Sequence, residues 1–349
     1  MRSLADDGVS GEVVERSGVR YARRWEAGSP TRRLSQDEAS GRPAQSERRL
    51  CLEAAPPPRA APSCSAQPGE IVDDRYLLER IAGHGGMGVV WRALELATGR
   101  LVALKLHNRR HSERLRLVQE AEVLSSVQHD ALVGYLGHGE LAASPYLAME
   151  WLDGEDLGER LARRPLSVAE TVTLGLRVAG ALAAVHARSV VHCDLKPANV
   201  FLPGGATEHA KLLDFGVARV EARGSIGPAQ SMVGTPGYMA PEQITAVGDI
   251  DARTDLFSLG VVLHECLAGH GPFAAKRAME ALRRTMQEPP PPLSSLRADV
   301  PPALVCLISA LLCRSPERRP QTAAWVVDRL HGIAAALDGR EALPLLAAG

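Results

Sequence analysis

The sequence predicts an α+β fold with two lobes, a small antiparallel sheet with one main helix followed by a larger helical lobe. Three observations predict this arrangement. Residues 76–106 contain three short strand-like runs separated by glycine-rich or turn-forming residues. An apolar pattern at helical spacing follows at residues 113–127, and from residue 154 to residue 330 the pattern is mostly helical. With 349 residues and 45% apolar side chains, the chain is long enough to bury a substantial core.

The strands of the first lobe are placed by the turns beside them. A glycine cluster separates the first two runs, and Thr98-Gly99-Arg100 is a turn signal before the third. The strands are expected at residues 76–82, 89–94, 101–106, 132–135 and 146–151. The helix at residues 113–127 is expected because Leu117, Ala121 and Leu124 recur on one of its faces.

The second lobe is expected to be built around long apolar helices. The clearest of these cover residues 168–187, 254–267 and 302–313. Residues 331–349 are expected to form a fraying helix and a short tail. The domain between the two ends therefore covers residues 73–330, with the sheet lobe at 73–150 and the helical lobe at 154–330.

Residues 1–72 have a different composition from the rest of the chain. They are rich in Arg, Glu, Ser, Gly, Ala and Pro and show little apolar periodicity. Such a segment buries too little apolar surface to offset the entropy of ordering it. We expect a disordered extension there, with a docking or autoregulatory arm as the alternative.

Charge and hydropathy argue against several classes of protein. The 40 basic and 41 acidic residues give a net charge of −1, whereas proteins that bind nucleic acid or anionic membranes usually carry a basic excess. The best apolar run, residues 303–313, is shorter than the roughly 20 residues that span a bilayer. Acidic residues interrupt every candidate signal sequence near the amino terminus. We therefore expect no nucleic-acid partner and no membrane span.

The six cysteines are scattered and contain no C-x-x-C pair. A disulfide framework or a zinc site would show closer pairing. This spacing predicts a reducing, cytoplasmic compartment.

The segment from Gly83 to Val90 fits the pattern G-x-G-x-x-G-x-V. Glycines allow backbone amides to approach phosphate groups closely. Alone, the pattern also fits a dinucleotide-binding turn or a flexible hairpin. The dinucleotide interpretation needs the third glycine to open a helix, whereas Gly88 runs into a strand-like segment. The pattern therefore favours a hairpin lid over phosphates.

Lys105 stands out because only four of the 40 basic residues are lysines and because it lies in an apolar strand. A lysine in a half-buried sheet needs an anionic partner, and Glu120 on the next helix can provide it. The alternative is an ordinary solvated lysine, which is what most lysines are.

The segment 191–199 places Asp194, Lys196 and Asn199 on one short loop. The aspartate can accept a hydroxyl proton, the lysine can neutralise a phosphoryl group, and the asparagine can hold a metal ion through its amide oxygen. Asp214 follows at the end of an apolar strand and suits Mg²⁺, which prefers oxygen ligands. Taken singly, either carboxylate would be explained by a helix cap or a surface charge.

Two further segments follow these motifs along the chain: Gly234-Thr235-Pro236-Gly237-Tyr238-Met239-Ala240-Pro241-Glu242 and Asp255-Leu256-Phe257-Ser258-Leu259-Gly260. All of the motifs thus follow one another in a single order. Residues 76–330 therefore resemble eukaryotic-type (Hanks-type) protein serine/threonine kinases of the bacterial branch. The resemblance implies the bilobal protein-kinase fold and transfer of the γ-phosphate of ATP, with Mg²⁺, to protein hydroxyls. Lys196 and Thr235 match the serine/threonine branch, so the expected acceptors are serine and threonine side chains of protein substrates. Self-association for autophosphorylation is also expected.

The resemblance also implies roles for individual residues. The lid over the phosphates corresponds to Gly83, His84, Gly85, Gly86, Met87 and Gly88. The adenine would lie among Ala82, Val90, Ala103, the gatekeeper Met149, the hinge backbone from Glu150 to Leu152, and Phe201. Lys105, paired with Glu120, would hold the α- and β-phosphates, Asn199 and Asp214 would bind Mg²⁺, and Asp194 would be the catalytic base. Glu242 matches the structural partner of Arg319.

Two features depart from the family pattern. The interval between Lys105 and Glu120 is a few residues short, which leaves Glu122 as a less favoured partner for the lysine. Cys193 replaces the arginine that usually precedes the catalytic aspartate, so the chain would be a kinase of the non-RD type. In the family that arginine pairs with a phosphorylated loop residue, and Ser225 and Ser231 are candidate sites for such phosphorylation here. A redox role for Cys193 is disfavoured because the adjacent carboxylate of Asp194 opposes thiolate formation.

Two alternatives belong to other classes. A pseudokinase scaffold would bind nucleotide and partners without chemistry, but such proteins commonly lack one of the four catalytic-set residues that are all present here: Lys105, Asp194, Asn199 and Asp214. A kinase for small molecules shares the fold but lacks the 234–242 segment that shapes a polypeptide site. Both arguments favour the protein kinase.

Overall fold

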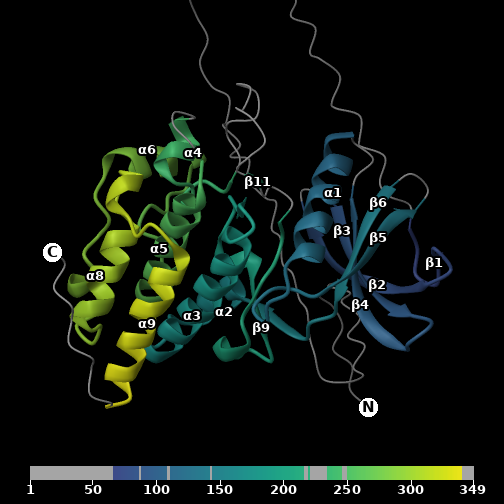
Figure 1. Cartoon of the computed structure of the whole chain (residues 1–349), viewed down its shortest axis with the longest axis horizontal. Helices are drawn as coiled ribbons and strands as arrows, with labels where there is room; N and C mark the ends of the chain where they lie inside the picture. Colours follow the sequence, from purple (N-terminus) through teal and green to yellow (C-terminus); the bar gives the residue numbers. More distant parts are fainter. Residues whose placement is uncertain are drawn as a thin grey trace, which may run out of the picture. The chain divides into compact units, whose positions relative to one another are not determined.

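The computed structural model describes residues 66–85, 88–107, 111–141, 144–215, 219–220, 234–245 and 250–339. All of these residues belong to one compact unit of the chain, Ala60–Gly349. Figure 1 shows a sheet with the helix α1 (His111–Ser126) beside it, and a group of helices that follows in the chain. The two-lobed α+β fold expected from the sequence is therefore observed.

Six strands form the sheet of the first lobe, in the order β1-β2-β3-β4-β6-β5, and every neighbouring pair is antiparallel. The strands are β1 (Ile71–Val72), β2 (Tyr76–Gly85), β3 (Gly88–Glu95), β4 (Arg100–His107), β5 (Tyr135–Leu141) and β6 (Ser144–Glu150). Val102, Leu104 and Leu106 alternate along β4 and are fully buried, as a half-buried strand requires. Lys105 lies between two of them and faces the opposite side of the sheet, toward α1.

The expected strand at residues 132–135 is wrong. Leu132 forms only an isolated parallel bridge with Leu212, and β5 begins at Tyr135. The backbone explains the difference, because Val133 N–H donates to the carbonyl of Leu212 and Leu212 N–H donates to the carbonyl of Ala131. These residues connect the segment after α1 to the helical lobe rather than to the six-stranded sheet.

The helical lobe is organised around α3 (Val168–His186) and α5 (Ala252–Ala268), which pack against each other. Ser167 and Glu170 form a reciprocal capping box at the start of α3, so this helix begins where the sequence offers partners for its first N–H groups. Gly269 ends α5 in the left-handed conformation with φ of 80°. The other helices are α2 (Leu157–Arg163), α4 (Pro241–Thr245), α6 (Ala278–Gln287), α7 (Leu293–Leu296), α8 (Pro302–Leu311) and α9 (Ala323–Leu337).

Short strands and single helical turns lie before and between the helices of the second lobe along the chain. A three-stranded sheet has the order β10-β9-β7, and a two-stranded sheet pairs β11 with β8. The strands are β7 (Gly154–Asp156), β8 (Val190–Val191), β9 (Val200–Pro203), β10 (Lys211–Leu212) and β11 (Arg219–Val220), and the turns are η1 (Pro197–Asn199), η2 (Thr207–His209) and η4 (Pro316–Arg318).

The last helix is longer than the sequence pattern suggested. Instead of fraying after residue 330, α9 continues to Leu337 and packs against α3. Val326, Leu330 and Ile333 are buried and follow one another at helical spacing, so the apolar stripe continues past the expected end.

One helix in the described part of the chain is long and apolar enough to cross a membrane, which corrects the expectation that none approaches this length. It is α3, with 19 residues. Its most apolar window is 56% buried inside the protein, and α3 contacts α5 and α9. Core helices of soluble proteins pass the same test of length and composition, and burial in the helical lobe accounts for the apolar character of α3.

Candidate active site

Lys105 joins two acidic residues that lie far apart in the sequence. Its Nζ is 3.0 Å from both carboxylate oxygens of Glu120 on α1 and 2.8 Å from Oδ1 of Asp214. Lys105 and Glu120 are buried, whereas the Asp214 side chain is 36% exposed. Glu122 is exposed on the same helix, so Glu120 is the partner of the lysine. Of the three side chains, the carboxylate of Asp214 is therefore the one most accessible to a ligand.

The electrostatic environment keeps this lysine charged. Burial alone would lower the pKa of Lys105, but the negative charges of Glu120 and Asp214 outweigh burial and raise its pKa above the usual value. The ammonium group therefore remains protonated at neutral pH and can bind a phosphate group.

The catalytic-loop residues expected from the sequence form one hydrogen-bonded cluster. Nζ of Lys196 donates to Oδ2 of Asp194 at 2.6 Å and to the hydroxyl of Thr235 at 2.8 Å. The Thr235 hydroxyl donates to Oδ1 of Asp194 at 2.7 Å, so both oxygens of this carboxylate are held. Nδ2 of Asn199 donates to the backbone carbonyl of Asp194 at 2.8 Å, which leaves the amide Oδ1 available as a ligand. A positioned carboxylate, a cation and an amide oxygen thus share one loop.

Asp255, in the first turn of α5, fixes the backbone of the loop just before Asp194. Its carboxylate accepts the N–H groups of His192 and Cys193, each at 2.8 Å, and contacts Nε2 of His186 at 2.8 Å. Burial alone would raise the pKa of Asp255, but the hydrogen bond from His186 and the nearby His192 hold it below the usual value. The loop is therefore anchored on a buried carboxylate that stays ionised.

The position of Asp214 depends on the same loop. Leu213, the residue before it, donates its N–H to the carbonyl of Asn199 at 2.8 Å and contacts Nε2 of His192 through its carbonyl at 3.0 Å. Asp214 has φ of 63°, a left-handed conformation that aspartate tolerates better than most residues. The buried Phe215 packs beside the ring of His192, with centroids 4.8 Å apart. These contacts direct Asp214 toward Lys105.

The glycine pattern lies in a β-hairpin, where Gly85 at the end of β2 pairs with Gly88 at the start of β3. Gly88 requires its missing side chain, because a Cβ there would lie 1.9 Å from the carbonyl oxygen of Leu106. Since the third glycine opens a strand and not a helix, the dinucleotide alternative is excluded. Gly83 and the exposed His84 also lie in β2, while Gly86 and Met87 are outside the described residues.

Most of the residues assigned to adenine lie on strands, some in the six-stranded sheet and Phe201 in the small sheet of the helical lobe. Val90 pairs with Lys105 across β3 and β4, and Ala103 pairs with Met149 across β4 and β6. Phe201 pairs with Asp156 and Lys211 in the small sheet of the helical lobe. Ala82 is half-buried in β2, and Leu152 packs against the hydrophobic core.

Glu150 has a contact that the sequence analysis did not anticipate. Its Oε1 accepts the N–H of Gly134 at 2.7 Å and pairs with Nζ of Lys211 at 2.6 Å. Lys211 also donates to the carbonyl of Leu132 at 3.2 Å. The side chain of Glu150 therefore links Gly134 to Lys211 on β10. The backbone of Glu150 pairs with Val102 on β4.

Glu242 and Arg319 form a bidentate pair with distances of 2.7 and 2.8 Å, and both are almost fully buried. Thr254 also donates to Glu242, at 2.9 Å. The guanidinium of Arg319 reaches three backbone carbonyls as well and lies 5.0 Å from the ring centroid of Phe257. Every polar group of this pair has a partner, as a buried ion pair requires.

Three polar residues contact the site although the sequence pattern predicted no role for them: His186, Gln243 and Asp255. Asp255 opens one of the quoted motifs, so its place in the motif order was a usable signal. Ser225 and Ser231, the candidate phosphorylation sites, lie outside the described residues. So do the side chain of Arg219 and all of Arg223, the two arginines that are alternative receivers for a loop phosphate in place of residue 193.

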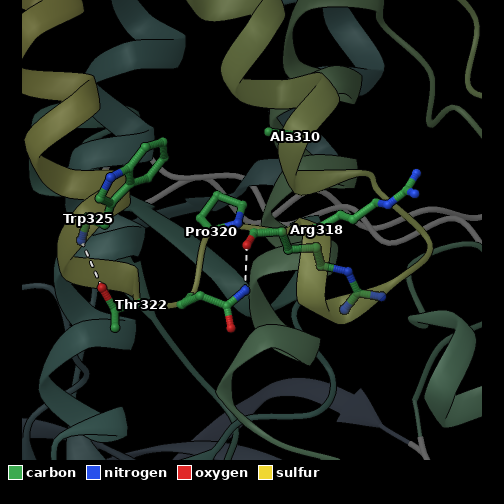
Figure 2. Close-up of a pocket in the computed structure, with 7 residues that line it drawn as sticks. Ala310, Arg318, Pro320, Thr322 and Trp325 are labelled. Atoms are coloured by element: carbon green, nitrogen blue, oxygen red, sulfur yellow. Dashed lines mark hydrogen bonds between the residues drawn. The ribbon is translucent and has the colours of Figure 1, made fainter. Parts of the chain in front are cut away.

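A cavity of about 380 Å³ lies between η4, α8 and α9 (Figure 2), and neither Lys105 nor any residue of the catalytic loop lines it. Figure 2 shows the ring of Trp325 on one side and Arg318 on the other, with Pro320 between them. The lining residues are Ala310, Arg318, Arg319, Pro320, Gln321, Thr322 and Trp325. None of them is a carboxylate, so this cavity does not suit a magnesium–nucleotide complex.

The fold and the cluster define a class of protein: a bilobal protein in which a glycine hairpin, a buried lysine–glutamate pair and a loop with aspartate, lysine and asparagine converge. The family model described as "Protein kinase domain" matches residues 76–329. The chain belongs to the protein kinase domain family.

Curated relatives are bacterial serine/threonine-protein kinases. The chain is 36% identical over 279 residues to pkn2 of Myxococcus xanthus, which covers 77% of this chain and 33% of pkn2. It is 33% identical over 271 residues to PknL of Mycobacterium tuberculosis, covering 76% of this chain and 67% of PknL. Against the first three relatives the chain spans between 33% and 51% of their length.

The fold is also shared with a solved kinase domain. The TM-score is 0.66 at 21% identity, and the match covers 76% of this chain and 98% of the other. At this level of identity the comparison concerns the fold.

Proposed function

We propose that this protein transfers the γ-phosphate of ATP to serine and threonine hydroxyls of protein substrates, with Mg²⁺ as the metal ion. The observation that carries the proposal is the cluster in which Lys105 contacts Glu120 and Asp214 while Asp194 contacts Lys196 and Thr235. The serine/threonine specificity is supported by the names of the relatives and by the Lys196–Thr235 contact. Protein substrates and autophosphorylation between two copies of the chain are part of the proposal.

The side chains divide the chemistry between them. Asp194 would orient the acceptor hydroxyl and take its proton, since its two oxygens are held by neighbouring donors. Lys196 would neutralise charge on the phosphoryl group, and Lys105 would hold the phosphates nearer the adenine. The kinase needs no covalent intermediate, because positioning and charge stabilisation account for catalysis of this reaction.

The metal ligands would be Asp214 and Asn199. A partly exposed carboxylate and an amide oxygen are ligands that Mg²⁺ accepts, and Mg²⁺ usually completes its shell with substrate phosphates and water. The described residues contain no group of three or more His, Cys, Asp or Glu side chains that could hold a metal on their own, which fits a site shared with the nucleotide. The ion would supply positive charge against the phosphate oxygens.

Incubation of the purified full-length chain with labelled ATP, Mg²⁺ and a generic protein acceptor tests the proposal, followed by mapping of the phosphorylated residues. Lys105→Met should lower turnover by about 100-fold, because it removes the cation that binds phosphate and its link to Glu120. The matched control is Lys276→Met, a lysine outside the cluster, which should keep the wild-type rate. Full activity of Lys105→Met would show that its assigned role is wrong.

Phosphorylation of the loop between Asp214 and Glu242 should have little effect on the rate. The arginine that would bind a loop phosphate from position 193 is replaced by cysteine, so no charge-assisted hydrogen bond comes from that position. We expect Ser225→Ala/Ser231→Ala to retain most of the wild-type rate toward an external substrate. Steady-state kinetics of phosphatase-treated wild type beside the double variant measure this. A loss of about tenfold or more in both, about 1.4 kcal/mol, would show that loop phosphorylation controls the enzyme.

A further inference from the structure

The side chain of Gln243 is almost completely buried and bridges two segments that are distant in the sequence. Its Nε2 donates to the backbone carbonyl of Cys193 at 2.8 Å, and its Oε1 accepts the N–H of Ala240 at 2.9 Å. Only 1% of the residue is exposed. One amide group therefore connects the residue before Asp194 to the chain that leads into α4.

The backbone of Cys193 is constrained on both sides. Its N–H donates to Oδ1 of Asp255 at 2.8 Å, and its carbonyl accepts from Gln243. Its φ is 66°, a left-handed conformation that is unfavourable for a residue with a side chain. Such a conformation persists where the surroundings fix it, and here two buried side chains do so.

The other end of the 234–243 segment approaches the same carbonyl. A Cβ on Gly234, whose φ is 130°, would lie 2.9 Å from Cγ of Met239, 3.1 Å from the carbonyl oxygen of Cys193 and 3.3 Å from Nε2 of Gln243. The next residue, Thr235, hydrogen-bonds to Asp194. Both ends of the segment therefore converge on residues 193 and 194.

We propose that Gln243 is a positioning residue for phosphoryl transfer, which holds the Cys193 carbonyl and the 234–243 segment together so that Asp194 is placed without a phosphate on the loop. This inference rests on the proposed kinase function. A neutral amide forms this connection in the unmodified chain, whereas an arginine at position 193 would act only after a loop residue had been phosphorylated. The connection supplies the ordering that the missing arginine would otherwise provide.

The first test is the steady-state kinetics of phosphatase-treated Gln243→Met. This variant keeps the approximate volume of the side chain and removes both hydrogen bonds. We expect kcat to fall by about tenfold or more, with KM for ATP within about twofold of wild type, because Gln243 is not among the residues proposed to bind ATP. Thr171→Val is the matched control: it removes a buried hydrogen bond in α3, to the carbonyl of Ser167, and should keep kcat.

The second test uses Gln243→Glu, which keeps an oxygen for Ala240 N–H. The introduced carboxylate cannot donate to the Cys193 carbonyl, but its protonated form can, and burial raises the pKa of a carboxyl group. The ratio of its kcat to that of wild type should therefore rise as the pH is lowered from about 8.5 to 6. A role in folding alone would not produce this pH profile.

The outcomes separate the inference from the function it rests on. Absence of transfer by wild type would contradict the kinase function itself. If wild type is active and both Gln243 variants have the same kcat as wild type at every pH, the positioning role is wrong. A kcat loss in Thr171→Val as large as that in Gln243→Met would also overturn it. If Gln243→Met does not fold by circular dichroism, the pH profile of Gln243→Glu decides between the same two outcomes.

Discussion

Asp194→Asn is expected to lower the rate of phosphoryl transfer by about 10³-fold while leaving ATP binding nearly unchanged. The asparagine amide has the same shape, and its oxygen can still accept one of the hydrogen bonds from Lys196 and Thr235. It cannot take a proton from the acceptor hydroxyl, so the loss falls on the chemical step. Steady-state kinetics with a protein acceptor, together with ATP titration by calorimetry, measure the two effects.

Asp299→Asn serves as the control, because this carboxylate is 60% exposed and pairs with Arg297 on the surface of the helical lobe. It should keep the wild-type turnover. Equal phosphate transfer by wild type and Asp194→Asn would contradict the kinase mechanism and favour a scaffold that binds nucleotide without using it.

The parts of the site that could be predicted from the sequence are those with a local pattern. The glycine hairpin, the loop with Asp194, Lys196 and Asn199, and the position of Asp214 are each contained in a short run of residues. Glu120 could be assigned because one helix follows the strand of Lys105 and because Glu120 belongs to the buried face of that helix, whereas Glu122 does not. The ion pair then follows from the cost of burying an isolated charge.

The remaining contacts join residues that are distant in the sequence through buried polar groups. Gln243 contacts Cys193 across 50 positions and His192 contacts Asp255 across 63, and neither belongs to an apolar period that a sequence pattern reveals. The error at residues 132–135 has the same origin. Its apolar residues are typical of a strand, but their backbone partners lie in β10 of the helical lobe.

Arg319→Met is expected to destabilise the fold by about 3–5 kcal/mol, because it leaves the carboxylate of Glu242 buried without its partner. The arginine also satisfies three backbone carbonyls, which would lose their donors. In urea unfolding followed by circular dichroism, the midpoint should shift by about 1 M or more. Arg283→Met removes an arginine from an exposed pair with Glu280 and should leave the midpoint unchanged.

The double variant Glu242→Gln/Arg319→Met separates two contributions to the free energy of unfolding: the stabilisation by the ion pair and the penalty of a buried, unpaired charge. Because it removes both charges, it should be more stable than Arg319→Met alone. Glu242 belongs to the 234–243 segment and lies next to Gln243, so loss of the pair should also lower kcat through the position of that segment. A midpoint for Arg319→Met equal to that of wild type would show that this buried pair contributes nothing to stability, and that the end of the segment is held by other contacts.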